Sequence, residues 1–381
     1  MVNDDSCQYL WGESMSDETY LDRLIDEEQL RAYLADALGP ADRLKVKRVD
    51  AGHSNETLFV TWGEQELVVR RPPPGKTADK AHDVLREHHV VDALQETAVP
   101  VPRTVLESDD HEVMGSDFYV MEKLEGDVIR TEEPAWLARP DARRQLSTEL
   151  VDTLAAIHDV DYESVGLGEF GYPEGFTQRQ VDRWHEQFKW ARETTADHRD
   201  LPSLERITEW LQANVPEDHP ETLVQGDYKL DNVMVAPAAE GTVASDDAAT
   251  GSEPKIIAVF DWEMATLGDP FTDLGWMLSF WHDEDDPEPP IPDLYPTLTA
   301  RDGYLSRQEL IDRYETETGY TFDEPRFYIV LATYKMGALG EMFFRRYLEG
   351  NSDDPMYPTM EAGVPGLLEQ ATAVIDGEYE I

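Results

Sequence analysis

The residues best suited to chemistry lie between Gln225 and Asp261. The segment Q-G-D-Y-K-L-D-N joins two apolar runs, and V-F-D-W-E stands at the end of a later apolar run. Asp227 and Asn232 are five residues apart, the separation of the base and a metal ligand in catalytic loops for phosphoryl transfer. Asp261 follows in the place of a second, metal-binding aspartate. The sequence therefore predicts a phosphoryl-transfer site.

Phosphoryl transfer depends on positioning and charge neutralisation more than on covalent help from the protein. A carboxylate such as Asp227 can aim and deprotonate the attacking hydroxyl. Mg²⁺ prefers oxygen ligands, which suits Asn232 and Asp261. The alternative is that Asp227 and Asp231 only shape and cap a turn, as these residue types do in most loops. The two motifs, Q-G-D-Y-K-L-D-N followed by V-F-D-W-E, together favour the catalytic interpretation.

Length and composition indicate a folded protein with more than one core. A chain of 381 residues should bury roughly 75% of its unfolded surface, which allows two lobes. The 40% hydrophobic content argues against disorder, and no apolar run is long enough to cross a membrane. The single cysteine, Cys7, lies in a polar leader without the features of a signal peptide. We expect a soluble, cytoplasmic protein without a membrane partner.

The acidic excess is the most unusual global property. Asp and Glu number 80 against 32 Lys and Arg, which gives a formal net charge of -48. Salt at about 1 M shortens the Debye length to roughly 3 Å and removes most of the self-repulsion. Because the acids are spread along the whole chain, a halophilic cytoplasm explains them better than a cationic substrate or partner. The same charge disfavours binding to nucleic acid.

The first third has the pattern of a sheet with two helices. We expect an acidic tail over residues 1–22 and an amphipathic helix over 26–38 that ends at Gly39. Short β-branched runs separated by Gly52 and Gly63 predict an antiparallel meander. The expected strands cover residues 46–49, 57–61, 67–69, 103–107 and 118–122, and the second helix covers 79–94.

The rest of the chain is expected to be mainly helical, with short strands around residues 225–232, the predicted catalytic turn. Helical periodicity marks residues 146–157, 176–190, 204–211 and 327–347. The expected strands cover residues 223–224, 233–235 and 256–260. Small, acidic and Gly residues over 236–254 predict a flexible hairpin insert, because a strand lies on each side.

Seven stretches follow one another from about residue 45 to 280: A-G-H-S-N-E-T, V-V-R-R-P-P-P-G, R-E-H-H-V-V-D-A-L, V-M-E-K-L-E-G, L-A-A-I-H-D-V-D, Q-G-D-Y-K-L-D-N-V-M-V and D-W-E-M-A-T-L-G-D-P-F-T-D-L-G-W. Together they resemble the aminoglycoside phosphotransferase and choline kinase-like family, most closely the kinase-like domain associated with acyl-CoA dehydrogenases. The resemblance implies an α+β, two-lobed protein kinase-like fold. Residues 23–124 would form a nucleotide-binding N-lobe of antiparallel sheet plus helix. Residues 125–381 would form a mainly helical, catalytic and substrate-binding C-lobe.

The resemblance also implies a role for individual positions. Asp227 would be the catalytic base, Asn232 and Asp261 would bind Mg²⁺, and ATP would be the phosphoryl donor. A Gly and small polar residues allow backbone amides to approach an anion, although an ordinary hairpin turn uses the same residue types. The implied nucleotide contacts are Gly52, Ser54, Asn55, Arg70, Glu87, Met121 and Lys123.

Two positions depart from the family pattern. The family normally has a lysine at the end of the third strand, where this chain has Arg70 and Arg71. Arginine can bind phosphate through two hydrogen bonds and keeps its charge. Glu87 is the expected partner of Arg70, unless it is one of the many exposed acids. Gln225 stands where histidine is usual, and glutamine can still hydrogen-bond to the backbone.

Other polar and aromatic residues have two interpretations each. Asp273 would brace the catalytic loop, as the resemblance implies, or cap the next helix, or do both. His158 is expected in the core, and no histidine stands at zinc-binding spacing from another His or Cys. Aromatic residues at helical spacing are more often core than pocket, which makes substrate contact the less favoured interpretation of Gln180, Arg183, Trp184 and Trp190.

The main hypothesis is an ATP- and Mg²⁺-dependent small-molecule O-phosphotransferase. Its acceptor would carry a hydroxyl group, on a hydroxyacyl-CoA or on an amino sugar or amino alcohol. The alternative, motivated by Arg70 and Gln225, is a nucleotide-binding pseudokinase that serves as a regulatory or partner-docking module. A protein kinase is disfavoured because no A-P-E element follows Asp261. The sequence leaves the acceptor and the oligomeric state open.

Overall fold

The computed structural model describes residues 17–49, 55–74, 83–217, 219–238, 253–352 and 354–378. The chain divides into two compact units. The first comprises Met1–Asp92 and Pro102–Leu124, and the second comprises Ala93–Val101 and Glu125–Ile381. The first unit contains an antiparallel sheet and the second is largely helical, which confirms the predicted α+β class.

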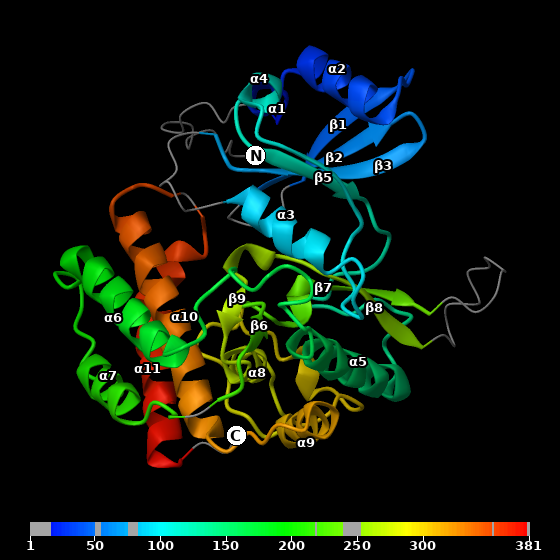
Figure 1. Ribbon diagram of the computed structural model, residues 1–381. Helices are drawn as coiled ribbons and strands as arrows, with labels where there is room; N and C mark the ends of the chain where they lie inside the picture. Colours follow the sequence, from blue (N-terminus) through cyan, green and yellow to red (C-terminus); the bar gives the residue numbers. More distant parts are fainter. Residues whose placement is uncertain are drawn as a thin grey trace, which may run out of the picture. The chain divides into compact units, whose positions relative to one another are not determined.

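The first unit is built on a sheet with the strand order β1-β2-β3-β5-β4, antiparallel throughout (Figure 1). The strands are β1 (Leu44–Val49), β2 (Glu56–Trp62), β3 (Gln65–Arg71), β4 (Thr104–Ser108) and β5 (Phe118–Glu122). Leu58 and Val60 of β2 are buried in one core with Leu30 and Leu34 of helix α2 (Glu27–Leu38). A slip of one residue would turn this apolar face outward, so burial fixes the register. The predicted meander is confirmed.

The start of the first unit differs from the predicted acidic tail. Helix α1 runs over Asp17–Leu24, inside the range expected to be a tail up to residue 22. Leu24 is buried in the core of the first unit, and Tyr20 and Leu21 pack against the same core. These three apolar side chains explain the difference, because together they give the segment one face to bury. Helix α2 begins as predicted, with Asp26 accepting hydrogen bonds from two backbone amides of its first turn.

Two further helices complete the first unit. Helix α3 (Val84–Ala93) falls within the predicted range 79–94, of which residues 79–82 lie outside the described part. Helix α4 (His111–Met114) was not predicted. It is a single turn, too short for a periodic pattern, and is closed by a side-chain cap from Asp110 and by Gly115 in a left-handed conformation.

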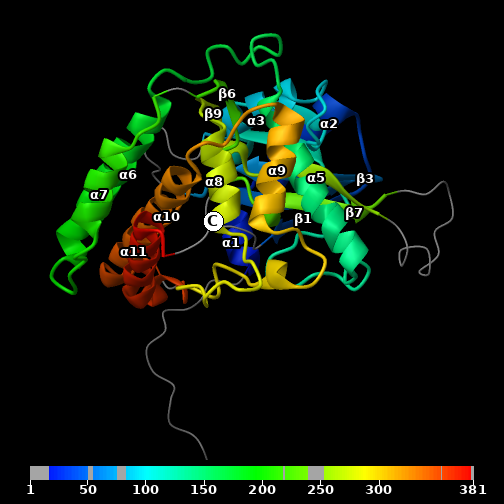
Figure 2. The same ribbon diagram turned by 90° about the horizontal axis from the view of Figure 1, so that it is seen from below.

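The second unit is mainly helical. Its helices are α5 (Pro140–His158), α6 (Phe176–Thr195), α7 (Leu204–Ala213), α8 (Phe271–Ser279), α9 (Arg307–Thr318), α10 (Pro325–Leu348) and α11 (Met360–Asp376). Helix α10 packs against α6, α8 and α11 (Figure 1, Figure 2). Most residues of α10 from Phe327 to Phe344 are buried, which confirms the prediction that this apolar segment belongs to a core.

Two short antiparallel strand pairs hold the catalytic turn. Strand β6 (Thr222–Val224) pairs with β9 (Thr266–Gly268), and β7 (Val233–Pro237) pairs with β8 (Pro254–Val259). The register places Val233 opposite Val259, and the Phe260 amide donates to the Asn232 carbonyl oxygen at 2.9 Å. Residues far apart in the sequence, Asn232 and Asp261, are therefore brought to the same end of one hairpin.

The connections around this hairpin refine the predicted boundaries. Strands β7 and β8 extend to Pro237 and Pro254, so the predicted insert is carried on a hairpin; residues 239–252 lie outside the described part, and the flexibility of the insert stays a prediction. The segment Ala93–Val101 belongs to the second unit and not to the predicted N-lobe. The reason is local: the Val259 amide donates to the Pro100 carbonyl oxygen at 2.8 Å. Within the described residues, no helix is long and apolar enough to span a membrane.

Candidate active site

The Asp227 carboxylate is held by three side-chain donors. Its Oδ1 accepts a hydrogen bond from Trp276 Nε1 at 2.7 Å. Its Oδ2 accepts from Lys229 Nζ at 2.6 Å and from Asn232 Nδ2 at 2.7 Å. A carboxylate has about four lone-pair sites, so one direction remains for a further donor. The side chain is therefore fixed in orientation by its surroundings.

Gln225 links the catalytic turn to the turn that carries Asp261. Its side-chain Oε1 accepts from the Asp227 amide at 2.7 Å, and its Nε2 donates to the carbonyl oxygens of Phe260 and Asp261 at 2.9 and 2.8 Å. Gln225 is fully buried. All of these bonds involve backbone groups of the two turns, so glutamine serves as the structural link that was expected from this position.

Asp273 braces the catalytic turn from helix α8. Its carboxylate accepts from the amides of Gln225 and Gly226 at 2.7 and 2.8 Å. The alternative prediction, that Asp273 caps the helix, is wrong, because it lies inside α8 and Asp269 accepts from the Phe271 amide at the helix start instead. His158 is buried as predicted. One ring nitrogen of His158 lies 3.4 Å from an Asp273 oxygen, and the other lies 2.7 Å from the Tyr314 hydroxyl.

Two residues of the site have backbone conformations that fix the turns. Gly226 has φ of +88°, and a Cβ there would lie 2.7 Å from the Met264 carbonyl oxygen, so only glycine fits. Asp261 has φ of 60° and ψ of 56°. Among the described residues it is the only non-glycine with positive φ. Aspartate tolerates this left-handed conformation better than most residues, and such strain is concentrated at functional sites.

The donor atoms suit a hard cation such as Mg²⁺. Asn232 Nδ2 donates to both the backbone and the side-chain oxygen of Asp227. Because a carboxylate only accepts hydrogen bonds, the amide orientation of Asn232 is fixed and its Oδ1 faces away from Asp227. That oxygen and the carboxylate of Asp261 are of the type that Mg²⁺ prefers. The residues present therefore fit a magnesium site.

Three basic groups surround the catalytic turn in this acidic chain. Burial disfavours the Lys229 ammonium, but the carboxylates of Asp227 and Asp231 outweigh burial and raise its pKa. Lys335 of α10 donates to the Gly226 carbonyl oxygen at 2.6 Å. Arg183 of α6 contributes to the electrostatic potential at Lys335, and no carboxylate within the described residues forms an ion pair with Arg183. Three basic side chains thus lie among the carboxylates of the site.

In the first unit, Arg70 forms the predicted pair with Glu87. Arg70 Nη2 lies 3.1 and 3.2 Å from the two carboxylate oxygens of Glu87, and its Nη1 donates to Thr57 Oγ1 at 3.0 Å. Glu87 is 3% exposed, so it is not one of the exposed surface acids. Arg71 is also buried but bonds to the carbonyl oxygens of Leu24 and Met114. Adjacent residues on a strand face opposite sides of the sheet, which separates the two arginines.

The other predicted nucleotide contacts are only partly described. Gly52 and Ser54 lie outside the described residues. Asn55 is 5% exposed, and neither of its side-chain polar atoms has a hydrogen-bond partner within the described part of the chain. Met121 lies in a small core cluster, and the Lys123 Nζ lies 5.2 Å from the centroid of a neighbouring aromatic ring. A buried side-chain amide rarely lacks a hydrogen-bond partner in proteins. The Asn55 side chain is therefore suited to binding a polar ligand.

A family comparison agrees with this geometry. Residues 45–303 match the model of the phosphotransferase enzyme family, known as APH. The chain belongs to this family. The matched range covers more than half of the sequence and includes both Arg70 and the catalytic turn.

Sequence relatives and solved structures also resemble this chain. Acyl-CoA dehydrogenase family member 11 of Homo sapiens is 32% identical over 90% of this chain, which spans only 42% of that protein. A Ralstonia eutropha protein provisionally named an aminoglycoside phosphotransferase is 28% identical, with a TM-score of 0.72 over 91% of this chain and 99% of that one. The GDP and kanamycin complex of an aminoglycoside phosphotransferase has a TM-score of 0.59 at 14% identity, covering 90% and 97% of the two chains. The predicted kinase-like fold is confirmed.

The sequence did not predict a role in the site for three side chains: Lys229, Trp276 and Lys335. Trp276 follows Asp273 by three residues, and residues three apart share a helix face, so the spacing was an available signal. Lys335 is the only charged residue between Arg326 and Glu341. A lysine inside an apolar helix is rarely buried without a partner.

The aromatic residues of α6 have different environments. Trp184 is 3% exposed, and its ring centroid lies 5.7 Å from Lys335 Nζ. Trp190 is 42% exposed and is covered by Arg345, whose guanidinium lies 4.0 Å from the ring centroid. Of the two tryptophans, only Trp184 lies beside Lys335, which donates a hydrogen bond to the catalytic turn. The core interpretation is therefore correct for Trp184 and does not hold for Trp190.

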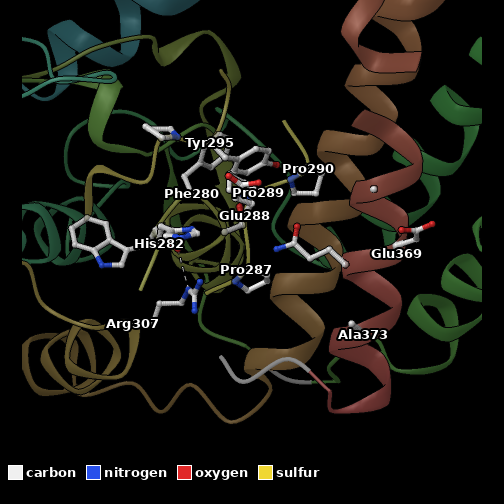
Figure 3. Close-up of a pocket in the computed structure, with 15 residues that line it drawn as sticks. Phe280, His282, Pro287, Glu288, Pro289, Pro290, Tyr295, Arg307, Glu369 and Ala373 are labelled. Carbon is white, nitrogen blue, oxygen red and sulfur yellow. Dashed lines mark hydrogen bonds between the residues drawn. The ribbon is translucent and has the colours of Figure 1, made fainter. Parts of the chain in front are cut away.

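A pocket of about 430 Å³ lies in the second unit (Figure 3). It is lined by the segment after α8 and by residues of α11 such as Ala373. Phe280 and Tyr295 on its wall are stacked, with ring centroids 4.7 Å apart. The Phe280 ring also lies 5.0 Å from that of Trp276, and Lys229 Nζ lies 5.7 Å from its centroid. One aromatic side chain thus separates the pocket from the donors of Asp227.

Proposed function

We propose that the chain is an ATP- and Mg²⁺-dependent O-phosphotransferase that transfers the γ-phosphate to a hydroxyl group of a small molecule. The observation that carries this proposal is the Asp227 carboxylate, which three donors fix in place while one accepting direction remains. A carboxylate held in this way can orient an acceptor hydroxyl for in-line attack.

The transfer step assigns a role to Asp227. The acceptor oxygen forms a bond to the γ-phosphorus as the bond between this phosphorus and the β,γ-bridging oxygen breaks. Asp227 accepts the proton of the hydroxyl, and ADP leaves. Asn232 and Asp261 would hold Mg²⁺, which when bound neutralises charge on the phosphate oxygens. The Lys229 ammonium, 2.6 Å from Asp227, helps to hold this carboxylate in place.

Nucleotide binding would use the first unit. Arg70 carries a charge that the buried Glu87 orients, which is the arrangement in which a cation contacts the α- and β-phosphates. The two departures from the family pattern therefore do not favour a pseudokinase. Arg70 has the acidic partner that the role needs, and Gln225 makes three hydrogen bonds to the two turns.

The surroundings of Asp227 favour an anionic acceptor with an apolar part. Arg183 of α6 lies near Lys335 and has no carboxylate partner among the described residues, although the chain as a whole carries a net charge of -48. Its guanidinium could bind a carboxylate or phosphate group of an acceptor, a group that an amino sugar or amino alcohol lacks. The pocket beside Phe280 has the size of small-molecule sites and an aromatic wall. A hydroxyacyl-CoA satisfies both features, and we therefore propose this class of acceptor.

A direct assay tests the proposal. The purified chain would be mixed in high salt with Mg²⁺, with ATP or GTP, and with hydroxyacyl-CoAs, free hydroxy acids, amino sugars or amino alcohols. We expect a phosphorylated hydroxyacyl product from the wild type and a large loss in Asp227→Asn. Asp312→Asn, an exposed aspartate of α9, is the matched control and should keep full activity.

Two results would contradict the proposal. Equal yields from the wild type and Asp227→Asn would remove the role of Asp227 as base. Tight nucleotide binding by calorimetry without transfer to any acceptor would favour the pseudokinase instead. Transfer to amino sugars alone would keep the reaction but overturn the proposed acceptor class.

A further inference from the structure

Lys335 is an unusual residue in helix α10. It is the only charged side chain in a run of apolar and small residues that packs against α6, α8 and α11. Its side chain is partly buried. Placing a lysine in such surroundings is unfavourable unless its ammonium group finds partners. The partners that it finds all belong to the catalytic turn or to the helices that support it.

The ammonium of Lys335 contacts two groups that hold Asp227. It donates a hydrogen bond to the Gly226 carbonyl oxygen at 2.6 Å, directly before Asp227 in the sequence. It also lies 3.7 Å from the ring centroid of Trp276, whose Nε1 donates to Asp227 Oδ1 at 2.7 Å. A cation over an aromatic face is attracted by the ring, and it polarises the indole toward stronger donation from its edge.

The charged groups that face Lys335 come from three elements. Burial lowers the pKa of its ammonium to about 8, while Asp227 of the catalytic turn and Asp273 of α8 oppose this shift. Lys229 of the turn and Arg183 of α6 lower the pKa further. Protonated below about pH 8, the side chain makes both contacts. Above that pH the neutral amine loses the cation–π attraction and hydrogen-bonds less strongly.

We propose that Lys335 is a positioning residue for phosphoryl transfer, because its ammonium fixes the Gly226 carbonyl and the Trp276 indole and so sets the direction in which Asp227 faces the acceptor hydroxyl. This role rests on the proposed function. It differs from acceptor binding in a measurable way, because it acts on the chemical step through Asp227 and leaves the acceptor's affinity unchanged.

The first test needs neither nucleotide nor acceptor. The fluorescence of Trp276 is obtained as the difference between the wild type and Trp276→Phe, across pH 6 to 10.5. We expect a titration with its midpoint about pH 8. It should be absent in Lys335→Met and in Lys335→Arg, whose guanidinium stays charged over this range. A wild type without the titration, or one that persists in Lys335→Met, would overturn the proposed contact.

The second test uses transfer kinetics on the same proteins. Lys335→Met should lower kcat about 10-fold with an unchanged acceptor KM, and should lose the wild-type decline of kcat above about pH 8. Lys335→Arg should recover most of kcat at pH 7 and hold it to higher pH. Lys189→Met, an exposed lysine of α6 paired with Glu186, is the control and should match the wild type.

The outcomes separate the two proposals. A raised acceptor KM with unchanged kcat in Lys335→Met would overturn the positioning role and make Lys335 a binding residue. Wild-type kinetics in Lys335→Met would overturn it as well. Absence of Asp227-dependent transfer, with the fluorescence titration present, would overturn the proposed function and the positioning role with it, while the contact between Lys335 and Trp276 would stand.

Discussion

The catalytic turn of the second unit and the Arg70 pair of the first unit hold their charged groups in different ways. Asp227 accepts hydrogen bonds from three side chains, and its backbone is tied to Gln225. Arg70 depends on the bridge to Glu87 and one bond to Thr57 among its described contacts. The first arrangement spreads the support over three side chains, whereas the second includes one buried ion pair that joins its two charged residues.

This contrast has a consequence for substitutions. Loss of a single supporting donor around Asp227 leaves the other donors in place, so the effect should be moderate. Loss of Arg70 leaves the buried Glu87 carboxylate without this cation, which is more damaging than the pair itself is stabilising. No other side chain of either region, however, can take over the proposed role of the Asp227 carboxylate.

The largest effect is expected for Asp227→Asn. Removal of a general base lowers kcat by about 10²- to 10⁴-fold, while the similar shape of asparagine should keep the fold. Steady-state kinetics give kcat, and thermal unfolding serves as the control for stability. A loss of less than about 10-fold would show that the carboxylate does not act as a base.

Arg70→Ala should have the next largest effect. We expect the KM for ATP to rise roughly 10- to 100-fold, since hydrogen bonds to charged groups contribute about 1.5–3 kcal/mol. Arg70→Lys keeps the charge and should stay closer to the wild type. The neighbouring Arg71→Met is the matched control. It should lower the free energy of unfolding by about 1–3 kcal/mol, because Arg71 bonds to the Leu24 and Met114 carbonyls, and leave the KM for ATP unchanged.

Gln225→Leu tests the link between the two turns. The variant loses three hydrogen bonds and leaves backbone groups of Asp227, Phe260 and Asp261 without partners. We expect the free energy of unfolding to fall by about 1–3 kcal/mol and the Mg²⁺ concentration at half-maximal rate to rise. Gln225→His, the residue usual in the family, should restore both. An unchanged Mg²⁺ dependence would show that the link does not position Asp261.

The smallest effect is expected for Trp276→Phe. Only one of three donors to Asp227 is lost, and a hydrogen bond of about 1 kcal/mol corresponds to a decrease in kcat of roughly 5-fold. Measurement of kcat in parallel with Asp227→Asn checks the ranking. If Trp276→Phe proved as damaging as Arg70→Ala, support of the catalytic turn would not be distributed, and the contrast between the two regions would fail.

The sequence predicted the parts of the site that depend on local spacing. Asp227 and Asn232 meet because the five-residue turn brings them together, and Asp261 joins them because two predicted strands pair in a hairpin. The bracing role of Asp273 followed from the resemblance and is supported by its two hydrogen bonds.

The contacts that the sequence did not predict depend on packing between distant elements. Lys335 reaches the Gly226 carbonyl only because α10 packs beside α8. Hydrophobic periodicity locates the buried face of such a helix but not the partner of a polar residue within it. The start of α1 was missed for a similar reason, since Leu24 is buried by a core assembled from strands much later in the sequence.

In the hairpin of β7 and β8, the alignment of the residues at the site does not depend on the length of the segment that joins the two strands. Asn232 and Phe260 are aligned at one end by cross-strand pairs that run from Val233 and Val259 to Pro237 and Pro254. The Val259 amide is also tied to the Pro100 carbonyl oxygen, so the alignment is set at the end of the hairpin that carries the site. The far end of the hairpin is therefore a suitable place for shortening, for an affinity tag or for a fluorescent label.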